Sequence, residues 1–121
     1  MSVKHAEEVE ARPVAAGRDT TIQVLISAEE GPNFALRRFR MLKGGGMPLH
    51  TNTVEHEQYV LRGRARVVVG AESQEVAAGD VVFIPEGVPH SYLNTGDEPF
   101  EFLCIIPNKD DKITIVDAAA C

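Results

Sequence analysis

Histidine is the residue type whose placement in this sequence says most about chemistry. Three of the four histidines, His50, His56 and His90, lie in the central part of the chain beside residues that favour turns. His50 and Asn52 are two positions apart, so in an extended segment their side chains point to the same side. Neutral imidazoles suit Fe, Mn, Zn, Cu or Ni, and a barrel could bring the three rings to one interior wall. The spacing indicates a candidate metal site; the alternative is that each histidine is a surface or hydrogen-bonded loop residue.

The elements that would position these residues are short strands. Segments rich in Val, Ile and Phe are separated by Gly, Pro and Asn about every 8 to 12 residues, which is typical of a sandwich or barrel. The predicted strands span 21–27, 34–42, 47–51, 57–61, 65–69, 75–76, 81–84, 91–93, 100–106 and 112–116. We expect an N-terminal arm over 1–20, a single domain over 21–117 and a C-terminal tail over 118–121.

Two segments of the chain resemble the two sequence motifs of the cupin family. The first is GMPLHTNTVEHEQYVLRG, which begins at Gly46 and ends at Gly63. The second is GDVVFIPEGVPHSYLN, which begins at Gly79 and ends at Asn94. Within the family, the chain is most similar to the small single-domain cupins that bind manganese or iron through four histidines. The resemblance implies an all-β jelly-roll barrel with one divalent transition metal per chain, Mn or Fe being favoured over Zn, Ni or Cu. It also implies a homodimer, to whose interface the predicted strand over 21–27 or the N-terminal arm before it would contribute.

The resemblance assigns metal ligands position by position. His50 matches the first ligand, His56 the third and His90 the last. Glu57 is the competing third ligand if the preceding turn is one residue longer. Asn52 departs from the family pattern, because it stands where the second histidine is expected.

Asn52 leaves two interpretations open. An amide oxygen binds a metal more weakly than an imidazole, so Asn52 could leave a coordination position for substrate or dioxygen, as a catalytic metal needs. Alternatively, loss of an imidazole lowers metal affinity so far that the barrel is a binding module without metal.

Strand alternation predicts the rest of the pocket. Gln58 shares a face with His56, and Phe102 and Cys104 share a face of a later strand. Arg37 alternates with the apolar residues of its own strand, where its planar fork could bind a carboxylate or enolate; the alternative is an ion pair at a rim or a subunit contact. We include Met47, beside His50 in the first motif, in the predicted substrate pocket.

Composition excludes several classes of protein. The chain has 121 residues, 44% of them hydrophobic and 25% charged, which is typical of one globular domain. A net charge of -6 argues against nucleic-acid binding, which depends on neutralising phosphates. The sequence contains no apolar run long enough to cross a membrane and no secretory leader, so we expect a cytoplasmic protein. Its two cysteines, Cys104 and Cys121, do not imply a disulfide framework.

The function expected from these features is that of a metal-dependent enzyme with a small-molecule substrate. The resemblance favours a mononuclear non-haem Fe or Mn oxygenase of the dioxygenase type, acting on a substrate that chelates the metal. A metal-dependent isomerase, cyclase or lyase without redox change is the second hypothesis. A ligand-binding cupin without catalysis is the third.

Overall fold

The computed structural model describes residues 1–116; the end of the predicted domain, the predicted tail over 118–121 and Cys121 lie outside the described residues. The chain forms one short 3-10 turn, η1 (Ala6–Glu8), and ten strands: β1 (Arg12–Pro13), β2 (Arg18–Ile26), β3 (Phe34–Asn52), β4 (His56–Arg62), β5 (Arg64–Val69), β6 (Glu72–Ala77), β7 (Val81–Ile84), β8 (His90–Asn94), β9 (Phe100–Pro107) and β10 (Ile113–Ile115). Within residues 1–116, no helix has the length and apolarity required to cross a lipid bilayer.

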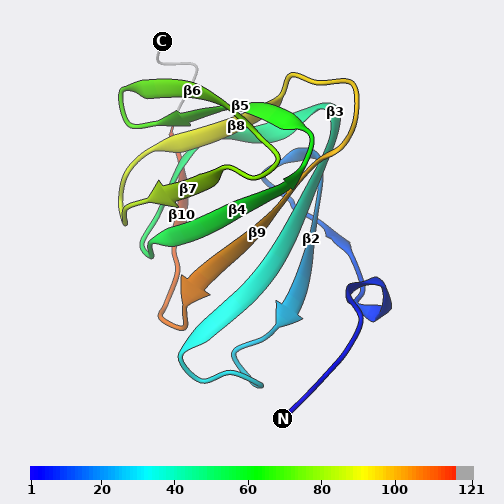
Figure 1. The fold of residues 1–121 in the computed structure, drawn as a ribbon. Helices are drawn as coiled ribbons and strands as arrows, with labels where there is room; N and C mark the ends of the chain where they lie inside the picture. The colour runs from blue at the N-terminus through cyan, green and yellow to red at the C-terminus, as the bar shows by residue number, and fades with distance from the viewer. Residues whose placement is uncertain (117–121) are drawn as a thin grey trace.

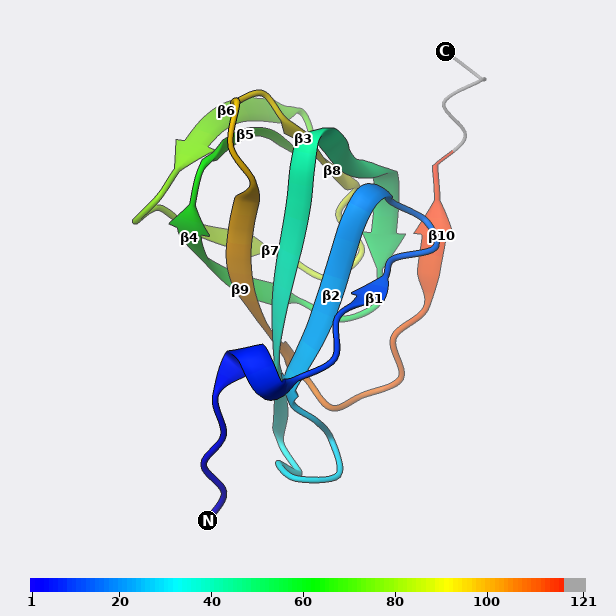
Figure 2. The same cartoon turned by 90° about the vertical axis from the view of Figure 1, so that its right-hand side faces the viewer.

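All the strands belong to one strongly curled antiparallel sheet. Its order is β6-β5-β8-β3-β9-β4-β7, and β1 is added through β2 while β2 and β10 each pair with β3. The curl brings β5, β6 and β8 opposite β9, β3 and β2, and β4 and β7 complete the wall (Figures 1 and 2). The predicted all-β jelly-roll barrel is confirmed.

The longest strand, β3, corrects one sequence-based boundary. The segments 34–42 and 47–51 were expected to be two strands separated by a glycine turn, but β3 runs without interruption from Phe34 to Asn52. A Cβ on Gly46 would lie 2.1 Å from the carbonyl oxygen of Tyr92, and Gly44 has a φ of 76°. The glycines therefore let one strand bend tightly against β8, so that its first half pairs with β9 and its second half with β8 and β10.

The segment before the first predicted strand also contributes to the barrel. β2 begins at Arg18, and β1 pairs with it, so the last part of the predicted 1–20 arm belongs to the sheet. Val14 and Ala16, between these strands, pack against the hydrophobic core. This segment is therefore part of the barrel wall.

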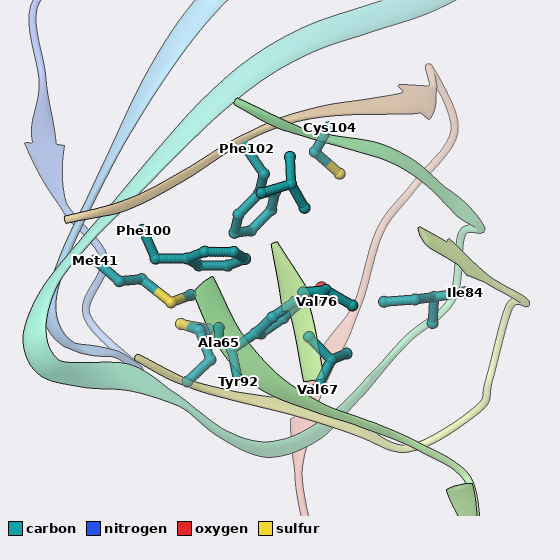
Figure 3. Close-up of a cluster of buried hydrophobic side chains, with 11 residues drawn as sticks. Met41, Ala65, Val67, Val76, Ile84, Tyr92, Phe100, Phe102 and Cys104 are labelled. Carbon is teal, nitrogen blue, oxygen red and sulfur yellow. The ribbon is translucent and has the colours of Figure 1, made fainter. Parts of the chain in front are cut away.

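The hydrophobic core extends from the end of the barrel opposite the histidines to the cavity, whose wall includes the core residues Met47, Tyr92 and Phe102. Met41, Phe100 and Phe102 are almost completely buried in this core, because inward-facing positions alternate along β3 and β9. Figure 3 shows Met41, Phe100 and Phe102 converging with side chains of β5 and β8. The polar side chain of Asn94 closes this end by donating to the carbonyl oxygens of Met41 and Glu98 at 3.1 and 2.9 Å. The apolar end is thus fully packed and internally hydrogen-bonded.

The outer face of β4, β7 and β9 carries exposed apolar side chains. Val81 and Phe83 of β7 retain 74% and 57% of their accessible surface, and Tyr59 and Ile105 beside them are also exposed. The homodimer expected from the family resemblance remains a prediction.

Candidate functional site

A cavity of about 140 Å³ occupies the histidine end of the barrel. Eight residues selected from the sequence lie on its wall: Arg37, Met47, His50, Asn52, His56, Gln58, His90 and Phe102. Five others complete it: Val14, Ile22, Phe39, Tyr92 and Ile113. The fold thus brings together side chains from β2, β3, β4, β8, β9 and β10, with one from the segment that joins β1 to β2.

The three histidines come from the ends of three strands. His50 lies near the end of β3, and antiparallel pairing sets it directly opposite His90, the first residue of β8. The centroids of these two rings are 4.1 Å apart, and the His56 ring, from the start of β4, lies 5.6 Å from that of His90. All three residues are buried, with exposures of 4%, 6% and 1% for His50, His56 and His90.

Backbone carbonyls fix the orientation of two of the imidazoles. Nδ1 of His50 lies 2.7 Å from the carbonyl oxygen of Pro48, and Nδ1 of His90 lies 2.9 Å from that of Val88. Because a carbonyl only accepts, each Nδ1 carries the proton and Nε2 keeps its lone pair. Nε2 of His90 and Nε2 of His56 are buried without a hydrogen-bond partner.

The environment of His56 and His90 keeps these two imidazoles neutral. Burial lowers the pKa of His56 to about 3, and the nearby positive charge of Arg37 contributes. Burial also lowers the pKa of His90 to about 4, against the opposing effect of its hydrogen bond to Val88. At neutral pH both rings are in the unprotonated form that binds metals.

Asn52 is held by a residue that the sequence analysis did not select. Its Nδ2 donates to both carboxylate oxygens of Asp111 at 3.3 and 3.2 Å, and the backbone N–H of Thr53 donates to the same carboxylate. The amide group is anchored through its nitrogen, and its Oδ1 is buried without a partner. Asp111 therefore leaves the better ligand atom of Asn52 free.

The chemistry of these side chains suits the binding of a divalent transition metal. Neutral imidazole nitrogens and an amide oxygen are accepted ligands, and three such atoms are buried with nothing to bind. In the described part of the chain, however, no three His, Cys, Asp or Glu side chains form a metal-binding cluster by themselves. A metal bound at this cavity would therefore need the amide oxygen of Asn52 and an adjustment of the imidazole rings.

Glu57, the alternative third ligand, lies away from the cavity. It faces the outer side of β4, near Phe83 and Ile105, while His56 faces inward. The pKa of Glu57 is raised to about 7, chiefly by a hydrogen bond with Glu55, and burial and the charge of Glu55 add to this effect. Strand alternation thus assigns the interior position to His56.

A polar row lies beneath the histidines. Strand pairing aligns Arg37 of β3, Cys104 of β9 and Gln58 of β4 across the inner face. Nη2 of Arg37 donates to Sγ of Cys104 at 3.2 Å, and Nε2 of Gln58 donates to the hydroxyl of Tyr92 at 2.6 Å and lies 3.6 Å from the same sulfur. Cys104 was expected to line the pocket. It faces inward but is fully buried behind the side chains of Arg37 and Gln58, and it is absent from the cavity wall.

Tyr92, Asp111 and Ile113 belong to the cavity or support it, and the sequence indicates only the first of them. Tyr92 follows His90 by two positions in a strand, so alternation alone places both on one face. Asp111 reaches Asn52, and Ile113 reaches the cavity wall, only because β10 returns to pair with the end of β3, where Ile113 lies opposite Asn52. No local pattern in the sequence indicates that pairing.

Comparisons with known proteins agree with this architecture. A family model described as "Cupin domain" matches residues 37–106. The 1-methylthio-D-xylulose 5-phosphate methylsulfurylase of Rhodospirillum rubrum is 35% identical over 95 residues, which are 78% of this chain and 60% of that protein. An oxalate-binding protein of Thermotoga maritima is 34% identical over 85 residues, or 68% of this chain and 70% of that protein.

Solved structures of other proteins also match the fold of this chain over most of its length. The polyketide cyclase RemF from Streptomyces resistomycificus matches with a TM-score of 0.88 and 30% identity over 96% of this chain and 85% of that chain. A cupin-2 domain from Rhodospirillum rubrum matches with a TM-score of 0.85 and 30% identity over 98% of this chain and 82% of that chain. With the family model covering more than half of its length, the chain belongs to the cupin family.

Proposed function

We propose that this cupin is a metal-dependent enzyme that acts on a small, largely apolar organic substrate able to chelate the metal. One observation supports this proposal most. Within residues 1–116, the buried side-chain nitrogen and oxygen atoms without a partner belong to Arg37, Asn52, His56 and His90, and all four residues line the same cavity. Unsatisfied buried polar groups are costly, and their concentration at one site is typical of a site that binds something.

The proposed ligands are His50, Asn52, His56 and His90. Mn or Fe is the favoured metal, with Zn, Ni or Cu as alternatives, since imidazole and amide donors do not select strictly among them. A divalent metal bound there would supply Lewis acidity for negative charge that develops on a substrate oxygen.

The aromatic residues of the cavity favour a planar substrate. The rings of Phe39 and Phe102 stack with centroids 5.1 Å apart, and those of Tyr92 and Phe102 stack with centroids 5.2 Å apart. Stacked rings offer flat apolar surfaces and exclude water from the polar atoms beside them. Burial raises the pKa of Tyr92, so its hydroxyl stays protonated near neutral pH and can act as a hydrogen-bond donor.

The sulfur atoms around the cavity favour chemistry without redox change. The thioether of Met47 lies on the wall, and the thiol of Cys104 lies directly behind it. Both groups are targets of oxidation, which would disrupt the packing of the pocket. A cyclase, isomerase or lyase reaction is therefore our first candidate, and it agrees with the name of the polyketide cyclase that this chain resembles.

Asn52 supports a second candidate, a dioxygenase. An amide oxygen is a weaker ligand than imidazole and could yield its position to dioxygen or to a second substrate atom. Dioxygen consumption separates the two reactions. With 1,3-diketones and phenolic alkenes as candidate substrates, we expect turnover by the Mn-loaded or Fe-loaded protein to continue without air. Consumption of one dioxygen per turnover would favour the dioxygenase.

Metal content is the first test of the proposal. In protein purified without a histidine tag, we expect about one transition metal per chain by elemental analysis and loss of that metal in a His90→Ala variant. His5→Ala is the matched control, because His5 lies outside the cavity near η1 and contacts Glu7. Free metal at about a hundredfold excess over its Kd should stabilise the parent by about 2.7 kcal/mol. Absence of metal and of any stabilisation, even after reconstitution with Fe(II) or Mn(II), would leave the third hypothesis, a metal-free binding barrel.

A further inference from the structure

Arg37 presents a positive charge to the inside of the barrel. Its strand position faces inward, and its guanidinium carbon lies 5.1 Å from the centroid of the Phe39 ring, a cation–π contact. Its Nη2 donates to Sγ of Cys104, while its Nε is buried with no partner. The side chain is thus held in place by apolar and sulfur contacts but is not fully hydrogen-bonded.

This charge has no counterion in the described structure. None of the ion pairs formed by residues 1–116 includes Arg37. Its neighbour Arg38, which faces outward, pairs with the buried carboxylate of Glu101 at 2.5 Å and with Glu7 at 3.6 Å. Within residues 1–116, the ion pair with a carboxylate is thus formed by Arg38 and not by Arg37.

The thiol beside Arg37 does not neutralise it. Burial raises the pKa of Cys104, although Arg37 and Gln58 act in the opposite direction. The thiol remains uncharged near neutral pH, so it accepts a hydrogen bond without supplying negative charge. A partly buried cation that lacks an anion destabilises the empty barrel and favours any ligand that brings one.

We propose that Arg37 binds an anionic oxygen of the substrate, so that the substrate class is a small organic anion, a carboxylate or enolate, with a planar apolar body. This inference rests on the proposed function, because it concerns the same cavity. It does not rest on the metal. The cavity volume of about 140 Å³ is close to the ~150 Å³ of an engineered protein cavity that holds benzene, so one six-membered ring fits.

The hydrogen-bond donors around the cavity suit an anionic ligand. Arg37 offers only N–H groups, and the hydroxyl of Tyr92, which accepts from Gln58, keeps its own proton available to donate. A guanidinium can hold a carboxylate through two parallel bonds, which orients the ligand as well as binding it. The net charge of -6 disfavours general attraction of anions to the surface, so anion binding would report this local site.

The test compares benzoate with benzamide, which has nearly the same shape but no charge. Their affinities are measured by calorimetric or NMR titration with chelator-treated protein and again with Mn-loaded protein. We expect chelator-treated parent protein to bind benzoate at least about tenfold more tightly than benzamide, as a charge-assisted pair should provide. Arg37→Gln should abolish this preference, and Arg37→Lys should retain part of it.

Arg66→Gln is the matched control. It removes the same unit of charge from an exposed residue that pairs with Glu75 outside the cavity, and it should keep the parent preference. Circular dichroism and thermal melting establish that each variant is folded, and Arg37→Lys tests the inference if Arg37→Gln does not fold.

The outcomes separate this inference from the proposed metal chemistry. A benzoate preference in metal-free protein that disappears in Arg37→Gln supports the role of Arg37 even if no metal ever binds. Equal binding of the two ligands by metal-free parent protein would overturn it. A preference that appears only with Mn and survives in Arg37→Gln would also overturn it, while leaving the metal proposal intact.

Discussion

Two asparagines at opposite ends of the barrel show how differently the two ends are built. Asn94, at the packed end, donates to two carbonyl oxygens and accepts from the backbone N–H of Gly96 at 2.9 Å. Asn52, at the histidine end, is bonded through its nitrogen to Asp111 and keeps a buried oxygen without a partner. The same side chain thus completes the fold at one end and leaves a binding group unused at the other.

The residues around the two asparagines differ in the same way. Around Asn94 the neighbours Met41 and Phe100 are almost fully buried hydrocarbon, and they stabilise the barrel by excluding water. At the other end, buried imidazoles and a guanidinium reduce stability in the absence of a ligand. The residues that mainly stabilise the barrel and those proposed to bind a ligand therefore lie largely in different parts of one small barrel, and Tyr92 and Phe102 belong to both.

The largest expected effect tests the packed end. Phe100→Ala should lower the free energy of unfolding by about 3–5 kcal/mol, because it opens a cavity in the core. Urea denaturation measures the change. Phe83→Ala is the control, since Phe83 is 57% exposed and its loss should change stability by less than about 1 kcal/mol. Equal losses in both variants would contradict the assignment of stability to the Phe100 end.

A comparison of the two asparagines should give the next largest effect. Asn94→Ala leaves the carbonyl oxygens of Met41 and Glu98 without their donor, and we expect a loss of about 2–3 kcal/mol. Asn52→Ala removes the donor Nδ2 from Asp111, which keeps the N–H of Thr53, and it also removes a buried oxygen that lacks a partner. These two effects oppose each other, so the variant should cost less than about 1 kcal/mol. Thermal melting of both variants in the presence of chelator checks the difference. A larger loss for Asn52→Ala would reverse the comparison.

The smallest expected effect concerns Asp111 and the proposed metal. Asp111→Ala frees the amide of Asn52 to rotate, and we expect metal affinity to fall by about 10- to 100-fold, as for other residues that orient ligands. Competition titration with a chromogenic chelator measures this affinity without any activity assay. Asp110→Ala is the control, because only the backbone oxygen of Asp110 bonds to Thr53. Unchanged affinity in Asp111→Ala would mean that the orientation of Asn52 is irrelevant to the metal.

The sequence predicted those parts of the site that follow from strand alternation. His56 and Gln58 face inward together because they are two positions apart in β4, and the structure agrees. Alternation predicts the face of the strand on which Cys104 lies. It does not predict whether other side chains separate Cys104 from the cavity. The side chains of Arg37 and Gln58, from the two neighbouring strands, cover it.

The features that escaped prediction depend on contacts between distant segments. The glycine run of β3 was interpreted as a turn, because local sequence does not reveal that Tyr92 lies where a Cβ on Gly46 would be. Asp111 meets Asn52 only after β10 has docked on β3. Local periodicity predicted the strands and their faces, whereas these long-range approaches require the folded chain.

The strand β10 has a consequence for how fast a ligand can exchange. It spans three residues, pairs with β3, and carries Ile113 on the cavity wall while Asp111 precedes it. A short strand with exposed residues opens at lower free energy than the long strands around it, so its amide hydrogens should exchange with solvent before those of β3. Each opening would release Asn52 and uncover one side of the cavity, so the residence time of a bound molecule should follow the opening rate of β10.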